Sequence, residues 1–334
     1  AWSGVILVGL AVGGLFVSLG ITRVPVANPQ RKFRVNFLGD LWSQIRLIRT
    51  DRVLWLAVLG NTYFYFLASL LQFNILFYGI EVLHVSETRN SLLMATVAIG
   101  IGFGNLAAGY LSGNKIEYGL IPLGSLGLTA FGSLLFLDGL TYSQVGLLLA
   151  LMGFSAGFFI VPISALIQRL PPDDERGGVI AASNLLSFVG IFLSSVVYFV
   201  CAFAGLYPKG IFLASAALTV GATVYVVIIL PDALLRLFLW LLTHTIYRVR
   251  VEGRDNIPAK GGALFVCNHL SFVDALMLIA STDRFIRFIM DKSYYDHPLL
   301  KPFARIMQAI PISAQQRPKE MLRSLNAARE SIQD

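Results

Sequence analysis

Charged residues are scarce in this chain of 334 residues, at 13% against about 25% in soluble domains. Cysteine is scarcer, since only Cys201 and Cys267 occur and neither belongs to a C-x-x-C pair. The first shortage excludes an ordinary soluble domain, and the second argues against a disulfide framework or a structural zinc site. No nucleic-acid-binding motif accompanies the net charge of +7. We therefore expect no metal and no nucleic acid partner.

Long apolar runs dominate instead, and the mean hydropathy is +0.71. A membrane-spanning helix needs about 20 mostly apolar residues. Seven stretches qualify, at roughly 3–22, 53–78, 91–113, 119–137, 142–167, 178–204 and 210–230. They are rich in Gly and Ala, which lets neighbouring helices approach closely. We expect residues 1–230 to form a multi-pass α-helical membrane bundle.

Basic residues gather in alternate connections between these spans. They are Arg23, Arg31, Lys32, Arg34, Arg46, Arg49, Arg52, Lys115, Arg169 and Arg176. The opposite side has Arg89 and Lys209. The positive-inside rule makes the basic side cytoplasmic, so the chain after Leu230 also emerges in the cytoplasm.

Two further segments are amphipathic. Residues 37–50 place Phe37, Leu41 and Trp42 on one helical face and arginines on the other. This pattern fits a helix on the inner leaflet and equally a helix packed on the bundle, and both readings stay open. Residues 231–246 are apolar over too short a length to span, so we expect an interfacial linker helix there.

Short strand and helix patterns alternate after this linker. Strands are predicted for YRVRVEG (247–253), ALFVC (263–267, buried), RFIRFIM (284–290) and AIPIS (309–313). Helices are predicted for SFVDALMLIAS, for HPLLKPFARIMQ with a break at Pro302, and for PKEMLRSLNAARESIQ. Such alternation indicates an α/β domain over 247–334.

The stretch VCNHLSFVDA (266–275) is a candidate site. Its S-x-x-D pattern predicts a capping box, with Ser271 at the helix N-cap and Asp274 in the first turn. Because the chain turns here, the imidazole of His269 and the carboxylate of Asp274 can converge. A carboxylate on one imidazole nitrogen makes the other a better base for an alcohol, and the helix N-terminus can hold an anion. From the spacing alone, an incidental His beside a common capping box remains the alternative.

Amide side chains interrupt the predicted spans. They are Asn61, Gln72, Asn74, Asn105 and Asn184. Polar residues inside a membrane are candidates for a transport pathway. Uncharged amides also serve as hydrogen-bonding partners between helices, so both roles are open for each residue.

Residues 268–274, NHLSFVD, resemble the N-H-x-S-x-x-D block of the glycerophospholipid acyltransferases. The flanks agree, because RFIMDKSYYDHPLLKPFARIMQAIPI resembles the second block of that family. The resemblance implies that His269 is the base that deprotonates a glycerol hydroxyl, which then attacks an acyl thioester. It implies that Asp274 orients His269, and that Asn268 and Ser271 shape the turn and contact the substrate.

The same resemblance implies contacts between the substrate phosphate and Lys292 and, with a weaker match, Arg287. The third block of the family, an E-G-T-R-like stretch, is absent and would follow shortly after Asp334. We therefore expect a truncated acyltransferase domain that is inactive by itself.

The membrane region resembles the major facilitator superfamily. GYLSGNKIEYG (109–119) is similar to its short cytoplasmic loop motif, with departures at Gly113 and Asn114. The basic segment 23–52 is similar to the long loop that joins the two six-helix halves. The first span would then be the sixth helix, and the remaining spans the second half of a facilitator fold.

A facilitator bundle followed by such an acyltransferase domain resembles bacterial fusions that import lysophospholipid across the inner membrane and re-acylate it. The implied acyl donor is acyl carrier protein or coenzyme A bearing an acyl group, with no tightly bound cofactor. The implied partners are lysophospholipid, membrane lipids and acyl carrier protein. Two other readings stay open: a transporter with a non-catalytic cytoplasmic domain, and an acyltransferase of new phosphatidic acid synthesis.

Overall fold

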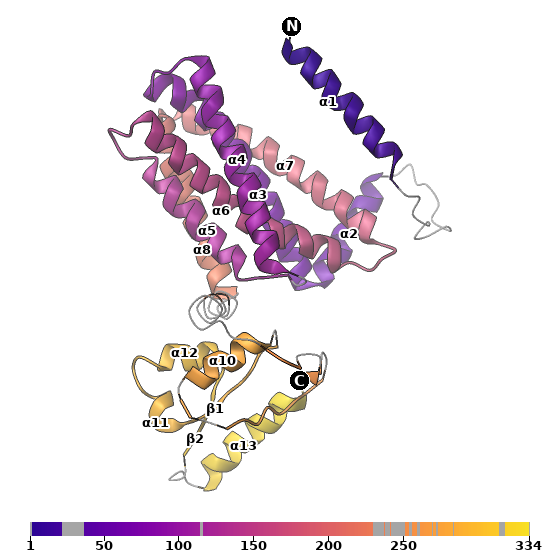
Figure 1. The fold of residues 1–334 in the computed structure, drawn as a ribbon, viewed down its shortest axis with the longest axis vertical. Coiled ribbons are helices and arrows are strands. Elements are labelled where there is room, and N and C mark those ends of the chain that lie inside the picture. The colour runs from indigo at the N-terminus through magenta and orange to yellow at the C-terminus, as the bar shows by residue number, and fades with distance from the viewer. Residues whose placement is uncertain are drawn as a thin grey trace.

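The structure is a computed structural model that describes residues 2–21, 37–113, 116–229, 237, 241, 251–253, 256–258, 261–268, 270–271, 273–282, 284–313 and 318–333. Figure 1 shows two parts, a helical bundle and a smaller α/β part below it. Most of the predicted linker, 231–246, lies outside the described residues, apart from Leu237 and Leu241.

The helices of the membrane part lie within residues 2–229. They are α1 (Trp2–Leu19), α2 (Phe37–Thr50), α3 (Arg52–Phe77) with the π-helical turn η1 (Tyr78–Val82), α4 (Glu87–Ser112), α5 (Leu120–Leu134), α6 (Tyr142–Arg169), α7 (Arg176–Phe203) and α8 (Pro208–Ile229). Among them, α1 is exposed along residues 4–19 and lies apart from the others (Figure 1), and α2 is amphipathic. Within the described residues, five are long and apolar enough to cross a membrane, namely α3 with η1, α4, α6, α7 and α8. The other two predicted spans are the shorter apolar helices α1 and α5. The predicted membrane bundle is therefore confirmed.

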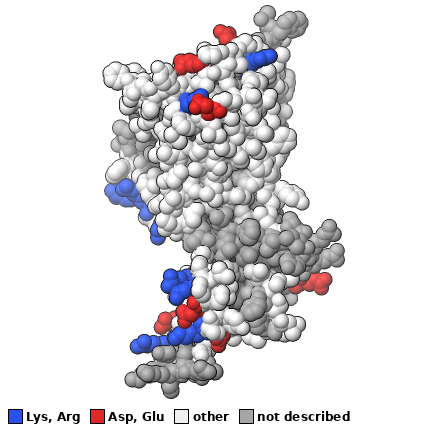
Figure 2. Space-filling view, turned by 90° about the vertical axis from the view of Figure 1, so that its left-hand side faces the viewer, with Lys and Arg blue, Asp and Glu red and all other residues white. Residues whose placement is uncertain are grey.

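Charge is distributed along the bundle as a membrane protein requires. Figure 2 shows charged side chains near the top of the molecule and lower down, with an uncharged belt between them on this face. Arg169 ends α6 and Arg176 begins α7, so both belong to the end of the bundle where α4 stops and α5 starts. Arg89 and Lys209 lie in the first turns of α4 and α8, at the opposite end. This arrangement matches the predicted alternation of basic connections.

Glycines hold α4, α5 and α6 together. Two G-x-x-x-G pairs face each other, Gly100 and Gly104 on α4 and Gly153 and Gly157 on α6. A Cβ added to any of the four would lie under 3.0 Å from a backbone atom of the other helix, closer than real Cβ atoms come. We call these four residues the glycine seam. A Cβ on Gly124 of α5 would likewise meet the backbone of α6 under 3.0 Å, so α6 has a close neighbour on two sides.

Helix α2 packs on the bundle, which resolves the two open readings of residues 37–50. Ile48 is fully buried, and the buried Gln44 donates from Nε2 to Glu175 Oε2 at the start of α7, at 2.8 Å. Gly178 of α7 lies against the carboxamide of Gln44, without room for a side chain. Trp42 remains 60% exposed on the other side of α2. The helix therefore braces α7 by its inner face.

The α/β part contains two short parallel strands and their connecting helices. In chain order they are α10 (Val273–Ser281), β1 (Ile289–Asp291), α11 (Lys292–Tyr295), α12 (Lys301–Ile306), β2 (Ile310–Ile312) and α13 (Pro318–Gln333). Ile289 pairs with Ile310 in the strand register. Ile279 of α10 and Met307 form a small buried core with three partly buried neighbours, Leu276, Phe288 and Phe303. The predicted alternation of strands and helices is confirmed in outline.

Two details of this part differ from the sequence prediction. Residues 263–267 are neither helix nor strand, and Leu264 and Val266 are 71% and 85% exposed, so the prediction of a buried strand is wrong. In the described chain β1 and β2 pair only with each other, which leaves this run without a strand to bond to. Pro302 does not break α12 but lies in its first turn, where its missing N–H is not needed.

The glycine seam generates a stability prediction. Gly104→Ala places a methyl group against the α6 backbone, so the two helices must separate or shift, and we expect a loss of about 1–3 kcal/mol. Gly102→Ala is the matched control, because nothing lies within 4 Å of a Cβ at that position of the same helix. Thermal unfolding of the detergent-solubilised protein would measure both. Equal midpoints for the two variants would contradict the seam.

Candidate functional site

The turn before α10 holds the predicted site residues Asn268, Ser271 and Asp274. Asp274 Oδ2 accepts hydrogen bonds from the backbone N–H groups of Leu270 (2.7 Å) and Ser271 (2.8 Å). Ser271 Oγ accepts from the N–H of Val273 at 3.2 Å. One carboxylate oxygen thus gathers two amides and fixes the chain where it enters the helix. A negative group in the first turn is also favourable to the helix dipole.

This arrangement matches one half of the predicted capping box. The first-turn acid reaches back to the N–H of Ser271, as a capping box requires. The reciprocal bond differs, because Ser271 Oγ accepts from Val273 rather than from Asp274. The N–H of Asp274 instead donates to the carbonyl oxygen of Ser271 at 3.1 Å. The turn is therefore tighter than the predicted box, and its shape depends on Asp274.

His269, the predicted base, lies outside the described residues, so its pairing with Asp274 stays a prediction. Both chain neighbours of His269 are described: Asn268 and Leu270 are exposed, and Leu270 is 88% exposed. Cys267, predicted to be a small core residue, is also exposed, and that prediction is wrong. The turn is accessible to a substrate from outside the domain.

Arg284 was not singled out from the sequence, yet its side chain binds the loop that precedes this turn. Its guanidinium donates from Nη1 to the carbonyl oxygen of Pro258 at 2.7 Å and from Nη2 to that of Gly261. Its backbone N–H donates to the buried Thr282 at 3.2 Å. Arg284 thereby connects the end of α10 to the loop that leads into the motif. The only sequence signal is an Arg directly after an apolar helix, which is too common to carry a prediction.

The two predicted phosphate ligands lie at opposite ends of β1. Arg287 precedes the strand and Lys292 follows it directly as the first residue of α11. Five residues of extended chain span about 16 Å, and a shared phosphate contact of these two side chains stays a prediction. Asp291 caps α11 by accepting from Ser293, and these hydrogen bonds hold the pKa of Asp291 below its usual value.

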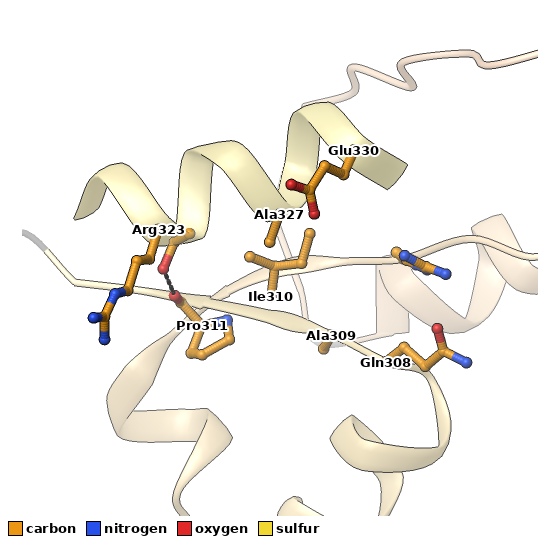
Figure 3. A pocket seen from close by; sticks show the side chains of 9 residues that line it. Gln308, Ala309, Ile310, Pro311, Arg323, Ala327 and Glu330 are labelled. Atoms are coloured by element: carbon orange, nitrogen blue, oxygen red, sulfur yellow. Dashed lines mark hydrogen bonds between the residues drawn. The ribbon is translucent and has the colours of Figure 1, made fainter. Parts of the chain in front are cut away.

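Arg287 lines an open groove between β2 and α13 instead. The groove has a volume of about 420 Å³ and is lined by Arg287, Gln308, Ala309, Ile310, Pro311, Arg323, Ser324, Ala327 and Glu330. Figure 3 shows Arg323 and Glu330 extending from α13 near opposite ends of the groove, with Ile310 and Ala327 between them. Ser324 Oγ donates to the carbonyl oxygen of Pro311 at 2.8 Å, which holds α13 on the strand. Basic and acidic groups therefore border the same apolar floor.

The predicted pathway amides in the bundle divide into two groups. Asn61 is buried and donates from Nδ2 to Ser187 Oγ at 2.9 Å and to Ser183 Oγ at 3.3 Å, which connects α3 to α7. Asn74 is also buried and donates to the carbonyl oxygen of Pro208 at 2.9 Å. These two residues are bonding partners between helices. Gln72, Asn105 and Asn184 are instead exposed on α3, α4 and α7.

No group of three or more His, Cys, Asp or Glu side chains that could hold a metal occurs among the residues the structure covers. The chemistry that the described turn offers is acid–base and anion-binding chemistry, carried by a carboxylate, a hydroxyl and helix N-terminal amides. The chain thus combines an apolar helical bundle with a later turn that carries the N-H-x-S-x-x-D sequence.

Comparison with known families defines both parts. Residues 1–195 match the Major Facilitator Superfamily, and the chain belongs to that family. Residues 248–333 match the Acyltransferase family. Both resemblances found in the sequence are therefore confirmed, and the chain is an integral membrane protein with an acyltransferase-family domain. The domain limits predicted at 230 and 246 fall between the two matched regions.

The curated relatives that match this chain include several bacterial transporters. It is 29% identical over 203 residues to the lysophospholipid transporter LplT of Enterobacter sp. (strain 638), covering 60% of this chain and 50% of the relative. Its identity to the lysophospholipid transporter LplT of Klebsiella pneumoniae (strain 342) is 29% over 213 residues, covering 63% and 53%. The chain thus spans about half the length of the curated relatives it matches. No solved structure matches it.

The cap at α10 generates a prediction about the turn. Asp274→Asn replaces a charged acceptor by a neutral amide, so the N–H groups of Leu270 and Ser271 lose part of their bonding, at about 1 kcal/mol. We expect hydrogen exchange at these two amides to accelerate about fivefold. Asp296→Asn is the control. The carboxylate of Asp296 pairs with the surface residue Lys301 at 3.4 Å and does not bond to this turn. Unchanged exchange in Asp274→Asn would mean that another group holds the turn.

Proposed function

We propose that the protein imports lysophospholipid across the bacterial inner membrane and that its acyltransferase domain restores the missing acyl chain. The observation that carries this proposal is the presence, in one chain, of a facilitator bundle similar to lysophospholipid transporters and an acyltransferase-family domain with an intact N-H-x-S-x-x-D turn. Transport delivers the acceptor to the membrane, and acyl transfer consumes it there. The two activities act on one substrate in sequence.

The chemical step follows from the residues of the turn. His269 removes the proton from the free glycerol hydroxyl of the lysophospholipid, and the oxygen attacks the thioester carbonyl carbon. The C–S bond breaks, the thiolate leaves and takes up the proton, and an ester bond has formed. Asp274 orients His269 and holds the turn, while Asn268 and Ser271 shape it.

The acyl donor is an acyl thioester of acyl carrier protein or coenzyme A, and no tightly bound cofactor is needed. Lys292 is the proposed ligand for the substrate phosphate, because it follows β1 directly. Arg287 serves this role only if phosphate binds in the groove beside α13. The basic connections support a cytoplasmic position for the acyltransferase domain, where acyl carrier protein and coenzyme A are available.

For transport, we propose that the exposed amides Gln72, Asn105 and Asn184 face the path of the lysolipid. Each is exposed on a helix whose other exposed residues are mostly apolar, for example Phe103 and Leu106 beside Asn105. A polar amide in such a surface is costly in lipid and useful beside a polar headgroup. Asn61 and Asn74 contribute indirectly, by fixing α3 against α7 and α8.

The acyl-transfer proposal predicts a separation of the two activities. In membranes containing the whole parent protein, His269→Ala should abolish acylation of labelled lysophosphatidylethanolamine and leave its uptake unchanged, because the base is not in the bundle. His297→Ala is the control, since His297 lies in the turn before α12 and accepts from the N–H of Leu299. Product formation by His269→Ala at the wild-type rate would remove His269 as the base and favour a transporter with a non-catalytic domain.

Acceptor competition in the same membranes separates the remaining alternative. If lysophosphatidic acid or glycerol 3-phosphate were acylated in preference to lysophosphatidylethanolamine, the domain would belong to new phosphatidic acid synthesis. Preference for lysophosphatidylethanolamine would support re-acylation of the imported lysophospholipid.

The transport proposal predicts the opposite separation. Asn105→Leu with Asn184→Leu should slow uptake roughly tenfold, the equivalent of one lost hydrogen bond of about 1.4 kcal/mol. Acylation of lysolipid supplied in detergent should not change. Phe192→Leu on α7 is the control, because this side chain is 69% exposed and apolar. Normal uptake in the double variant would place the path elsewhere.

A further inference from the structure

The chain that follows α8 contacts the bundle again at Leu237. This side chain is 2% exposed and packs with Ala108, Leu120 and Phe158 in a cluster separate from the main core. Leu241 packs partly buried against the same cluster. Both residues are helical, and their spacing of four places them on one helical face. We call this pair the leucine anchor.

The surface beneath the leucine anchor is built by three helices. Ala108 lies in the last turns of α4, Leu120 begins α5, and Phe158 belongs to α6. The ends of α4 and α5 that contribute here are those joined by residues 113–119, on the side predicted to be cytoplasmic. Helix α8 ends at the same side, at Ile229. Figure 1 shows the α/β part beyond this end of the bundle.

These three helices form one rigid unit. The glycine seam holds α4 to α6 backbone to backbone, and Gly124 does the same for α5 and α6. Helices that interlock in this way cannot slide or separate without losing close contacts over several turns. A side chain buried among all three is therefore attached to a fixed surface. The other long pair, α3 and α7, is joined through Asn61 and does not contribute to the cluster.

We propose that the leucine anchor docks the segment leading to the acyltransferase domain on the α4–α5–α6 unit and thereby couples transport to acyl transfer. The coupling of transport to acyl transfer rests on the proposed function, whereas the contact of the leucine anchor with the bundle does not. A domain on a free tether samples a large volume, whereas a docked one keeps its site at the place where lysolipid leaves the bundle. Imported lysolipid is then acylated before it spreads through the leaflet.

Cross-linking in the full chain tests the contact without any activity. In a background with Cys201→Ser and Cys267→Ser, the pair Leu237→Cys and Leu120→Cys should react rapidly with a short bifunctional thiol reagent. The pair Leu237→Cys and Leu106→Cys is the matched control, because Leu106 lies two residues from Ala108 on α4 and is 72% exposed. We expect little reaction in the control. Equal reaction of both pairs, or none in either, would overturn the docking.

A coupling assay tests the consequence. Leu237→Asp should leave uptake and the acylation of detergent-supplied lysolipid at wild-type rates, and should lower acylation of imported lysolipid several-fold. Leu237→Met should keep the coupled acylation at the wild-type rate, because Met is apolar and of similar size. If Leu237→Asp does not fold, the double variant Leu237→Ala with Leu241→Ala provides a milder test. Coupled acylation at the wild-type rate in folded variants would overturn the inference. Absence of acylation by the wild type in detergent would instead reject the proposed function, and the cross-linking result would stand independently.

Discussion

The close approach of α4 and α6 at four glycines is the constraint on which the bundle depends. In lipid, helices gain nothing from hiding apolar surface from water, so their association relies on packing and on hydrogen bonds. Gly100, Gly104, Gly153 and Gly157 let two backbones touch where any side chain would keep them apart. Because α5 approaches α6 through Gly124 in the same way, three helices act as one body.

The rest of the bundle adds side-chain hydrogen bonds to one more close approach, that of Gly190 on α7 to the backbone of Thr62 on α3. Asn61 connects α3 to two serines of α7, Tyr63 pairs with Thr219 of α8 at 2.8 Å, and Thr129 of α5 pairs with Thr223 of α8 at 3.2 Å. Side-chain hydrogen bonds are directional but can be exchanged, whereas a glycine seam has no alternative partner.

The acyltransferase domain shows how a small number of polar contacts prepares a site. The carboxylate of Asp274 accepts hydrogen bonds from two backbone amides. Arg284 connects the end of α10 to the loop ahead of the motif. Asp274 fixes the turn, and Arg284 fixes the loop that precedes it. The leucine anchor extends this logic to the whole domain, since it fixes the segment between α8 and the α/β part to the rigid unit.

The sequence by itself determined the membrane class, the position of every long helix, the α/β character of the C-terminal part and both family memberships. These follow from apolar length, charge placement and short motifs, which are properties of local chain. Only the tertiary structure decided that Asn61 and Asn74 bond between helices, that α2 packs on α7, and that 263–267 is exposed. Each of those depends on which distant segment supplies a partner, and neither periodicity nor spacing records that choice.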